Sequence, residues 1–220
     1  MSAIAAPEQL GRPRRSYFYV AAAILIAVVV FVGFAPSFYL KGVFGPSRDL
    51  SRLTITHGAV MTTWYVLFLL QVTLIARRRP DLQRRVGVVG VIVAALMVTI
   101  GSMVQYHSLG DDRAKMGTAH VIVASIAPFF DFAVLVGCAL YLRRKTDFHK
   151  RLMLLGTLTP LGAAIGRFPF AFVREHSLLL LNSIILACIA FDTWSYRRLH
   201  PAFLWGAIFL VATDLARRLL

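Results

Sequence analysis

Five of the six histidines lie at the ends of apolar segments, where their imidazoles could bind a metal ion or haem. His57, His120 and His176 lie near the outer start of predicted helices, and His149 and His200 lie at inner turns. Neutral imidazole ligates haem iron and most transition metals. The outer three could converge on one ion or haem, and the inner two could form a second site. Two histidine sites on opposite leaflets are what a transmembrane electron-transfer cytochrome requires.

The depth of the outer histidines favours a simpler role. His57 precedes Arg77 by 20 residues, which is about 30 Å of helix. That distance places His57 at the outer boundary of the membrane, where an amphipathic side chain is common without any ligand. Binding of haem b or a transition metal therefore remains one alternative, and an interfacial position without a cofactor is the other.

Two charged residues fall inside apolar segments. Asp131 lies 12 residues before Arg143, and Arg167 lies 16 residues after Arg151. Charges at membrane depth are costly and mark either a pairing or a function. The two heights differ by about 6 Å, so the spacing predicts an Asp131–Arg167 ion pair. The alternative is that Arg167 holds an anionic group, such as a carboxylate or a haem propionate, while Asp131 carries protons.

The composition is that of a membrane protein. Hydrophobic residues make up 58% of the 220 residues and the mean hydropathy is +0.71, against about 45–50% apolar residues in soluble domains. The net charge of +14 would suggest nucleic-acid binding in a soluble protein. Here Lys and Arg cluster between the apolar segments, as they do in the loops of membrane proteins. We therefore expect membrane lipids, and candidate membrane protein subunits, as partners, and no nucleic acid.

The predicted fold is all-α: a polytopic transmembrane helical bundle of about seven helices, forming one domain over residues 1–220. A helix needs about 20 apolar residues to span the hydrocarbon. Segments that meet or approach this length lie at 17–39, 55–76, 86–106, 117–142, 151–172, 177–196 and 202–216.

The distribution of Lys and Arg predicts the orientation. With the N-terminus inside, the inner segments carry fifteen of these residues and the outer segments carry eight. Cytoplasmic loops are enriched in Lys and Arg. The prediction is a cytoplasmic N-terminus and an external C-terminus.

The inner loops also indicate an internal repeat. Residues 77–85 and 143–151 share basic residues, an Asp and an apolar residue after it, and 197–200 is a weaker third copy. The expected arrangement is one leading helix followed by three helical hairpins in parallel orientation. Asp81 and Asp147 are predicted helix N-caps. Where the second copy has His149, the first has Gln83.

The segment from Asp147 through Phe148, His149, Lys150, Arg151 and Leu152 to Met153 resembles a motif of small multi-pass bacterial membrane proteins linked to cytochrome oxidase assembly. His57 followed by Met61 is also similar to these proteins. The chain resembles uncharacterised bacterial integral membrane proteins equally well. The resemblance implies a location in the bacterial inner (plasma) membrane and a respiratory role that involves haem or a metal.

The favoured function is thus a haem- or metal-associated respiratory or redox membrane component, or an assembly factor. One alternative is a small-solute or proton-coupled transporter that uses Asp131 and Arg167. A second is a metal-dependent membrane enzyme with His57, His120 and His176 as zinc ligands. No Glu or Asp that could act as base lies beside His57 or His120, which counts against the enzyme.

Overall fold

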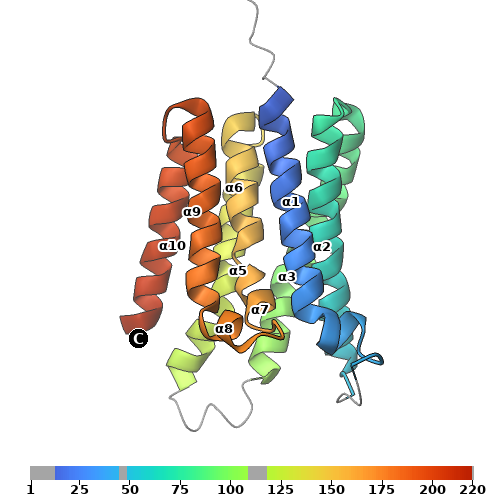
Figure 1. The fold of residues 1–220 in the computed structure, drawn as a ribbon. Coiled ribbons are helices and arrows are strands. Elements are labelled where there is room, and N and C mark those ends of the chain that lie inside the picture. The colour runs from blue at the N-terminus through green and yellow to red at the C-terminus, as the bar shows by residue number, and fades with distance from the viewer. Residues whose placement is uncertain (1–12, 45–48, 109–117, 220) are drawn as a thin grey trace, which may run out of the picture.

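The computed structural model describes residues 13–44, 49–108 and 118–219, in which every regular element is a helix (Figure 1). The first half contains α1 (Pro13–Phe34), the π-helical segment η1 (Ala35–Tyr39), α2 (Arg52–Ala76), α3 (Pro80–Ser108) and α5 (Thr118–Tyr141). The second half contains α6 (Thr146–Leu158), α7 (Leu161–Ile165), α8 (Ala171–Glu175), α9 (Ser177–Tyr196) and α10 (Pro201–Leu219). The prediction of an all-α fold is confirmed.

Four of the described helical stretches are long and apolar enough to cross a membrane. They are Tyr17–Tyr39, Arg52–Ala76, Pro80–Ser108 and Ser177–Tyr196. Helices α5, α6 and α10 lie alongside them in the same bundle (Figure 1). Large apolar side chains such as Trp194 and Trp205 are exposed on the bundle, as lipid contact requires. These features support a multi-pass membrane protein; the count of seven crossings and the orientation remain predictions.

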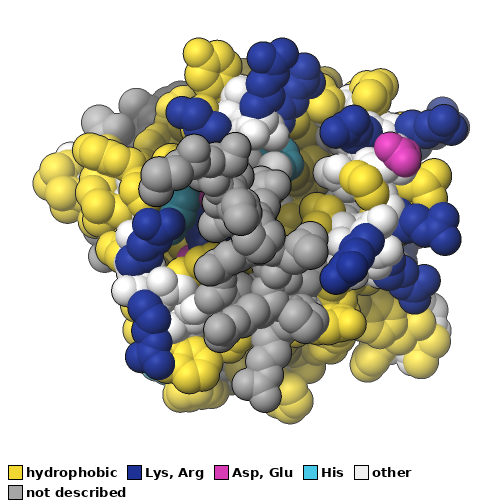
Figure 2. Space-filling view, turned by 90° about the horizontal axis from the view of Figure 1, so that it is seen from above, with side chains coloured by type: hydrophobic (Ala, Val, Ile, Leu, Met, Phe, Trp, Pro, Cys, Tyr) yellow, Lys and Arg dark blue, Asp and Glu magenta, His cyan; other side chains and the backbone are white. Residues whose placement is uncertain are grey.

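The two ends of the bundle differ in charge. One end, which we call the basic end, carries the turns at 77–79, 142–145 and 197–200 (Figure 1). Figure 2 looks onto this end and shows Lys and Arg side chains gathered around it. Its exposed basic residues are Arg77, Arg78, Arg79, Arg84, Arg85, Arg143, Arg144, Lys145, Arg197 and Arg198. The other end, which we call the opposite end, carries η1, α7 and α8 (Figure 1).

The segment predicted as one helix over 151–172 is broken in the structure. Helix α6 ends at Leu158, and the short helices α7 and α8 follow it at the opposite end. Proline lacks an amide hydrogen and its ring obstructs the preceding turn. Pro160 lies at the first break and Pro169 at the second. The breaks move Arg167 out of a helix and into the turn between α7 and α8.

The internal repeat remains a prediction. Helices α2 and α3 pack closely together, as do α5 and α6, but α9 packs mainly on α7 while α10 packs on α5 and α6. The first and third turns each contain a residue with positive φ, Arg78 at 55° and Arg197 at 57°. In each case a proline, Pro80 or Pro201, begins the next helix, a position where its missing N–H is harmless.

Close approach between helices depends on small residues. At Gly33, α1 crosses α7 so tightly that an added Cβ would lie 2.2 Å from the backbone oxygen of Ala164. At Gly58 of α2, an added Cβ would lie 2.5 Å from the ring of Phe38 in η1. These contacts fix η1 and the end of α1 against α7 and α2 at the opposite end.

Candidate functional site

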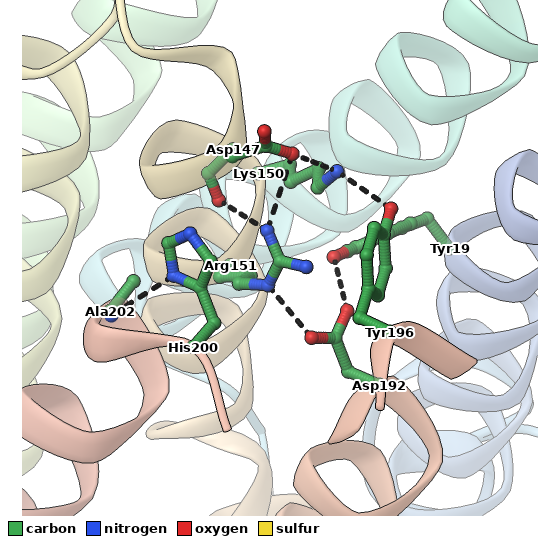
Figure 3. A network of polar contacts seen from close by, with 8 residues as sticks. All are labelled: Tyr19, Asp147, Lys150, Arg151, Asp192, Tyr196, His200 and Ala202. Atoms are coloured by element: carbon green, nitrogen blue, oxygen red, sulfur yellow. Dashed lines mark hydrogen bonds and ion pairs between the residues drawn. The ribbon is translucent and has the colours of Figure 1, made fainter. Parts of the chain in front are cut away.

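The most deeply buried charges lie near the basic end, where Arg151 of α6 meets Asp192 of α9 (Figure 3). Each side chain is only 1% exposed. The Nε of Arg151 donates a 2.8 Å hydrogen bond to Oδ2 of Asp192, and the hydroxyl of Tyr19 in α1 donates to Oδ1 at 3.3 Å. Asp192 therefore connects α9 to both α6 and α1.

Asp147 and Lys150 extend this network to the surface of the basic end (Figure 3). Arg151 Nη1 donates to the Asp147 backbone oxygen at 2.9 Å and to its Oδ1 at 3.3 Å. Lys150 donates to the same Oδ1, and this bond holds the pKa of the Asp147 carboxyl below its usual value. The expected N-cap role of Asp147 is wrong: it lies inside the first turn of α6, where Lys145 is the N-cap.

The two histidines at the basic end engage separate backbone groups. His149 donates from Nδ1 to the carbonyl of Ala139 at 2.8 Å. His200 accepts at Nδ1 from the amide of Ala202 at 3.1 Å, so it acts as the N-cap of α10. The ring of His200 also lies edge-on against Phe148, with centroids 4.8 Å apart. The structure thus gives each imidazole a local structural partner.

Burial lowers the pKa of His200, and the positive charge of Arg151 lowers it further. Lys150 acts in the same direction, while the carboxylates of Asp147 and Asp192 act in the opposite one. The folded protein therefore favours the neutral imidazole, whose Nδ1 can accept the amide of α10.

The outer histidines do not form a metal centre among the residues whose side chains are described. His57 lies edge-on against Phe129 at 6.0 Å, and His176 hydrogen-bonds through Nδ1 to the carbonyl of Phe172 at 2.9 Å. His120 belongs to α5, nine residues before Phe129, or about 13.5 Å along the helix; its side chain lies outside the described part. The described side chains contain no group of three His, Cys, Asp or Glu residues placed to hold an ion.

His57 has an unsatisfied polar atom. Its Nδ1 is buried and has no hydrogen-bond partner in the described part of the chain. A buried donor or acceptor without a partner costs about 1–3 kcal/mol. The protein tolerates this cost at the opposite end, beside η1.

Asp131 does not pair with Arg167. Its side chain is 3% exposed, and its Oδ2 lies 3.7 Å from Nη2 of Arg217 in α10. Thr213 and Asp214 of α10 also lie near it. Its Oδ1 is buried without a hydrogen-bond partner among the described residues. The prediction assumed a straight helix through Arg167, and the break after Leu158 removes that geometry.

Arg167 has no carboxylate partner within ion-pair distance among the described side chains. Its Nη1 donates to the carbonyl of Ala163 at 2.8 Å, and its guanidinium carbon lies 5.1 Å from the ring centre of Phe34. Phe34 lies four residues before Phe38, which packs on Gly58, the residue after His57. Arg167 and His57 therefore lie beside the same segment at the opposite end.

The Arg151–Asp192 pair is not evident from the sequence, in which Arg151 ends the basic segment 143–151. A signal was present, since Asp192 is an acidic residue within an apolar helix and such residues need a partner.

Comparison with protein-family models, with curated proteins and with solved structures gives no match to this chain.

Proposed function

We propose that this protein is a proton-coupled transporter of a small solute in which Asp131 binds and releases the proton. The observation that carries the proposal is the state of the Asp131 carboxylate. It lies ten residues from the end of α5 at Tyr141, which is about 15 Å along the helix. Among the described residues, one of its oxygens is buried without a hydrogen-bond partner, and Arg217 is its ion-pair partner at 3.7 Å.

A second carboxylate in the same bundle provides the comparison. Asp192 receives hydrogen bonds on both oxygens, from Arg151 and from Tyr19. Asp131 has a looser ion pair with Arg217, whose side chain is 24% exposed, and no hydrogen bond on Oδ1. A buried charge that serves only structure is expected to be satisfied as Asp192 is. The incomplete pairing of Asp131 favours a group that alternates between charged and protonated forms.

The position of Arg217 supports such a cycle. Protonation of Asp131 would remove the negative charge that holds Arg217, and α10 could then shift against α5. The ion pair would re-form when the proton leaves. Because α10 also packs on α6, this motion would change the packing of the helix that carries Arg151. Intramembrane carboxylates act as proton relays in many pumps and transporters.

Proteoliposomes with a pH-sensitive dye in the lumen test the proposal. Proton movement is recorded under a potassium diffusion potential, with and without gradients of dicarboxylates, phosphate, amino acids and sugars. We expect one class of solute to drive proton movement, and Asp131→Asn to abolish it. Asp81→Asn, which neutralises an exposed carboxylate at the basic end, is the control and should retain activity. Equal rates in both variants and the parent protein would contradict the proposal.

The haem or metal function is retained as a second candidate because of His57. A buried imidazole nitrogen without a partner is available to a ligand that the described residues do not provide. An optical spectrum and metal analysis of the purified protein would test it. Soret absorbance or stoichiometric metal that disappears in His57→Gln, but not in His176→Gln, would favour this candidate over the transporter.

A further inference from the structure

We infer that His57 and Arg167 form a binding site for a small anion, a carboxylate or a phosphate group, at the opposite end of the bundle. Binding at this site stands on the geometry of these residues. Only its use in transport, where the anion would be the solute that moves with the proton, rests on the proposed function.

The frame of the site is the segment from Gly33 to Tyr39. Gly33 brings α1 into contact with α7, and Phe38 packs directly on Gly58, the residue after His57. The hydroxyls of Tyr39 and Thr62 lie 2.7 Å apart, which fastens η1 to α2 one turn farther on. The frame thus holds α7, which leads to Arg167, and the part of α2 that carries His57.

The cation of the site is available for a ligand. Arg167 is exposed, and its hydrogen bond to Ala163 uses Nη1. Packing on Phe34 orients the planar guanidinium without neutralising it. A guanidinium presents a rigid fork of donors that matches a carboxylate or phosphate in two parallel hydrogen bonds.

His57 contributes the second polar group. Its ring is held against Phe129, and its buried Nδ1 has no hydrogen-bond partner among the described residues. A ring nitrogen that carries hydrogen can donate a hydrogen bond to an anion held by Arg167. The neighbouring η1 is a π-helix, a form that is rare and is frequently found at functional sites.

The ligand chemistry has two sources, a free anion in the water or the headgroup of an anionic phospholipid. The first arm of the test measures binding of succinate and of inorganic phosphate to the detergent-purified chain by calorimetry and by the shift in thermal unfolding. The second arm adds phosphatidylglycerol or phosphatidylcholine to the micelles. An effect of phosphatidylglycerol alone identifies the headgroup as the source, and saturable binding of a soluble anion identifies a solute.

Variants establish whether the effect belongs to this site. Arg167→Gln is expected to raise the apparent Kd by about tenfold or more, because charge-assisted hydrogen bonds are lost. Arg174→Gln removes the same charge from an exposed position on nearby α8 and should bind like the parent. His57→Gln should also weaken binding. Arg167→Lys keeps the charge and should bind with intermediate strength, which provides a readout if Arg167→Gln does not fold.

Two results would overturn the inference. The first is equal weakening in Arg167→Gln and Arg174→Gln, which would indicate a general charge effect. The second is the absence of any anion or phosphatidylglycerol effect that depends on Arg167. Solute-driven proton movement, measured on the parent protein, separates this inference from the proposed function. Intact binding with no solute-driven proton movement would leave the site standing and reject the transporter.

Discussion

Removal of Asp192 tests how strongly the buried pair near the basic end stabilises the fold. In Asp192→Ala the Arg151 guanidinium, 1% exposed, would lose the acceptor of its Nε hydrogen bond. Breaking a buried pair in this way costs about 3–5 kcal/mol. Replacing both partners by apolar residues, in Arg151→Met with Asp192→Leu, removes the stranded charge. Because Arg151 also bonds to Asp147 and lies 4.6 Å from the ring centre of Tyr196, the double variant should still lose about 1 kcal/mol.

The free energy of unfolding can be measured in mixed micelles of mild detergent and dodecyl sulfate, followed by the helical circular dichroism signal. Asp147→Asn is the matched control, because Asp147 also accepts a hydrogen bond from Arg151 but its side chain is 60% exposed. Its cost should stay below about 1 kcal/mol. The reasoning is refuted if the double variant loses as much as the sum of the two single changes, or if Asp147→Asn costs as much as Asp192→Ala.

Three further predictions address packing, pH and topology. Gly33→Ala should destabilise the protein by about 1–3 kcal/mol, because its Cβ meets backbone rather than a movable side chain. Gly90→Ala, whose Cβ meets no neighbour, should lose no stability in the same unfolding assay. The thermal unfolding midpoint should fall as pH drops below about 6.5, because the unfolded chain takes up a proton that folded His200, with its lowered pKa, resists. The variant His200→Asn keeps an N-cap acceptor but should lose that part of the pH dependence, and an unchanged slope would contradict the assignment. In a variant that lacks Cys138 and Cys188, a single cysteine at Asp49 should be labelled from outside. A single cysteine at Thr146 should be labelled only from the cytoplasmic side, and the reverse pattern would overturn the orientation.

Helix positions could be predicted because they depend on local composition. Runs of apolar residues of membrane length identify α1, α2, α3 and α9 without any knowledge of their neighbours. At 151–172 the sequence predicts one segment of membrane length, whereas α6 ends at Leu158, shortly before Pro160. A proline can bend a helix or end it, and the packing of α7 against α1 at Gly33 accompanies the second outcome here.

Partners of buried charges could not be predicted by counting residues from the loops. Such counts give the depth of a side chain but not the direction in which it points around its helix. Asp131 and Arg167 matched in predicted height, yet Asp131 faces α10 and its Arg217. Asp192 faces α6 and its Arg151, which the sequence presented as one of several basic loop residues. The rotation of each helix is set by its contacts with all its neighbours.

The sequence by itself determined that the chain is helical, that its surface suits a membrane, and that one set of turns is basic. These properties follow from the apolar fraction of each segment and from the placement of Lys and Arg between segments, both of which are local. Only the tertiary structure decided that Arg151 pairs with Asp192, that Asp131 has an oxygen without a partner among the described residues, and that Arg167 packs on Phe34 beside η1. Each of these features depends on how separate helices pack together. At the opposite end, that packing uses the close contacts that Gly33 and Gly58 allow.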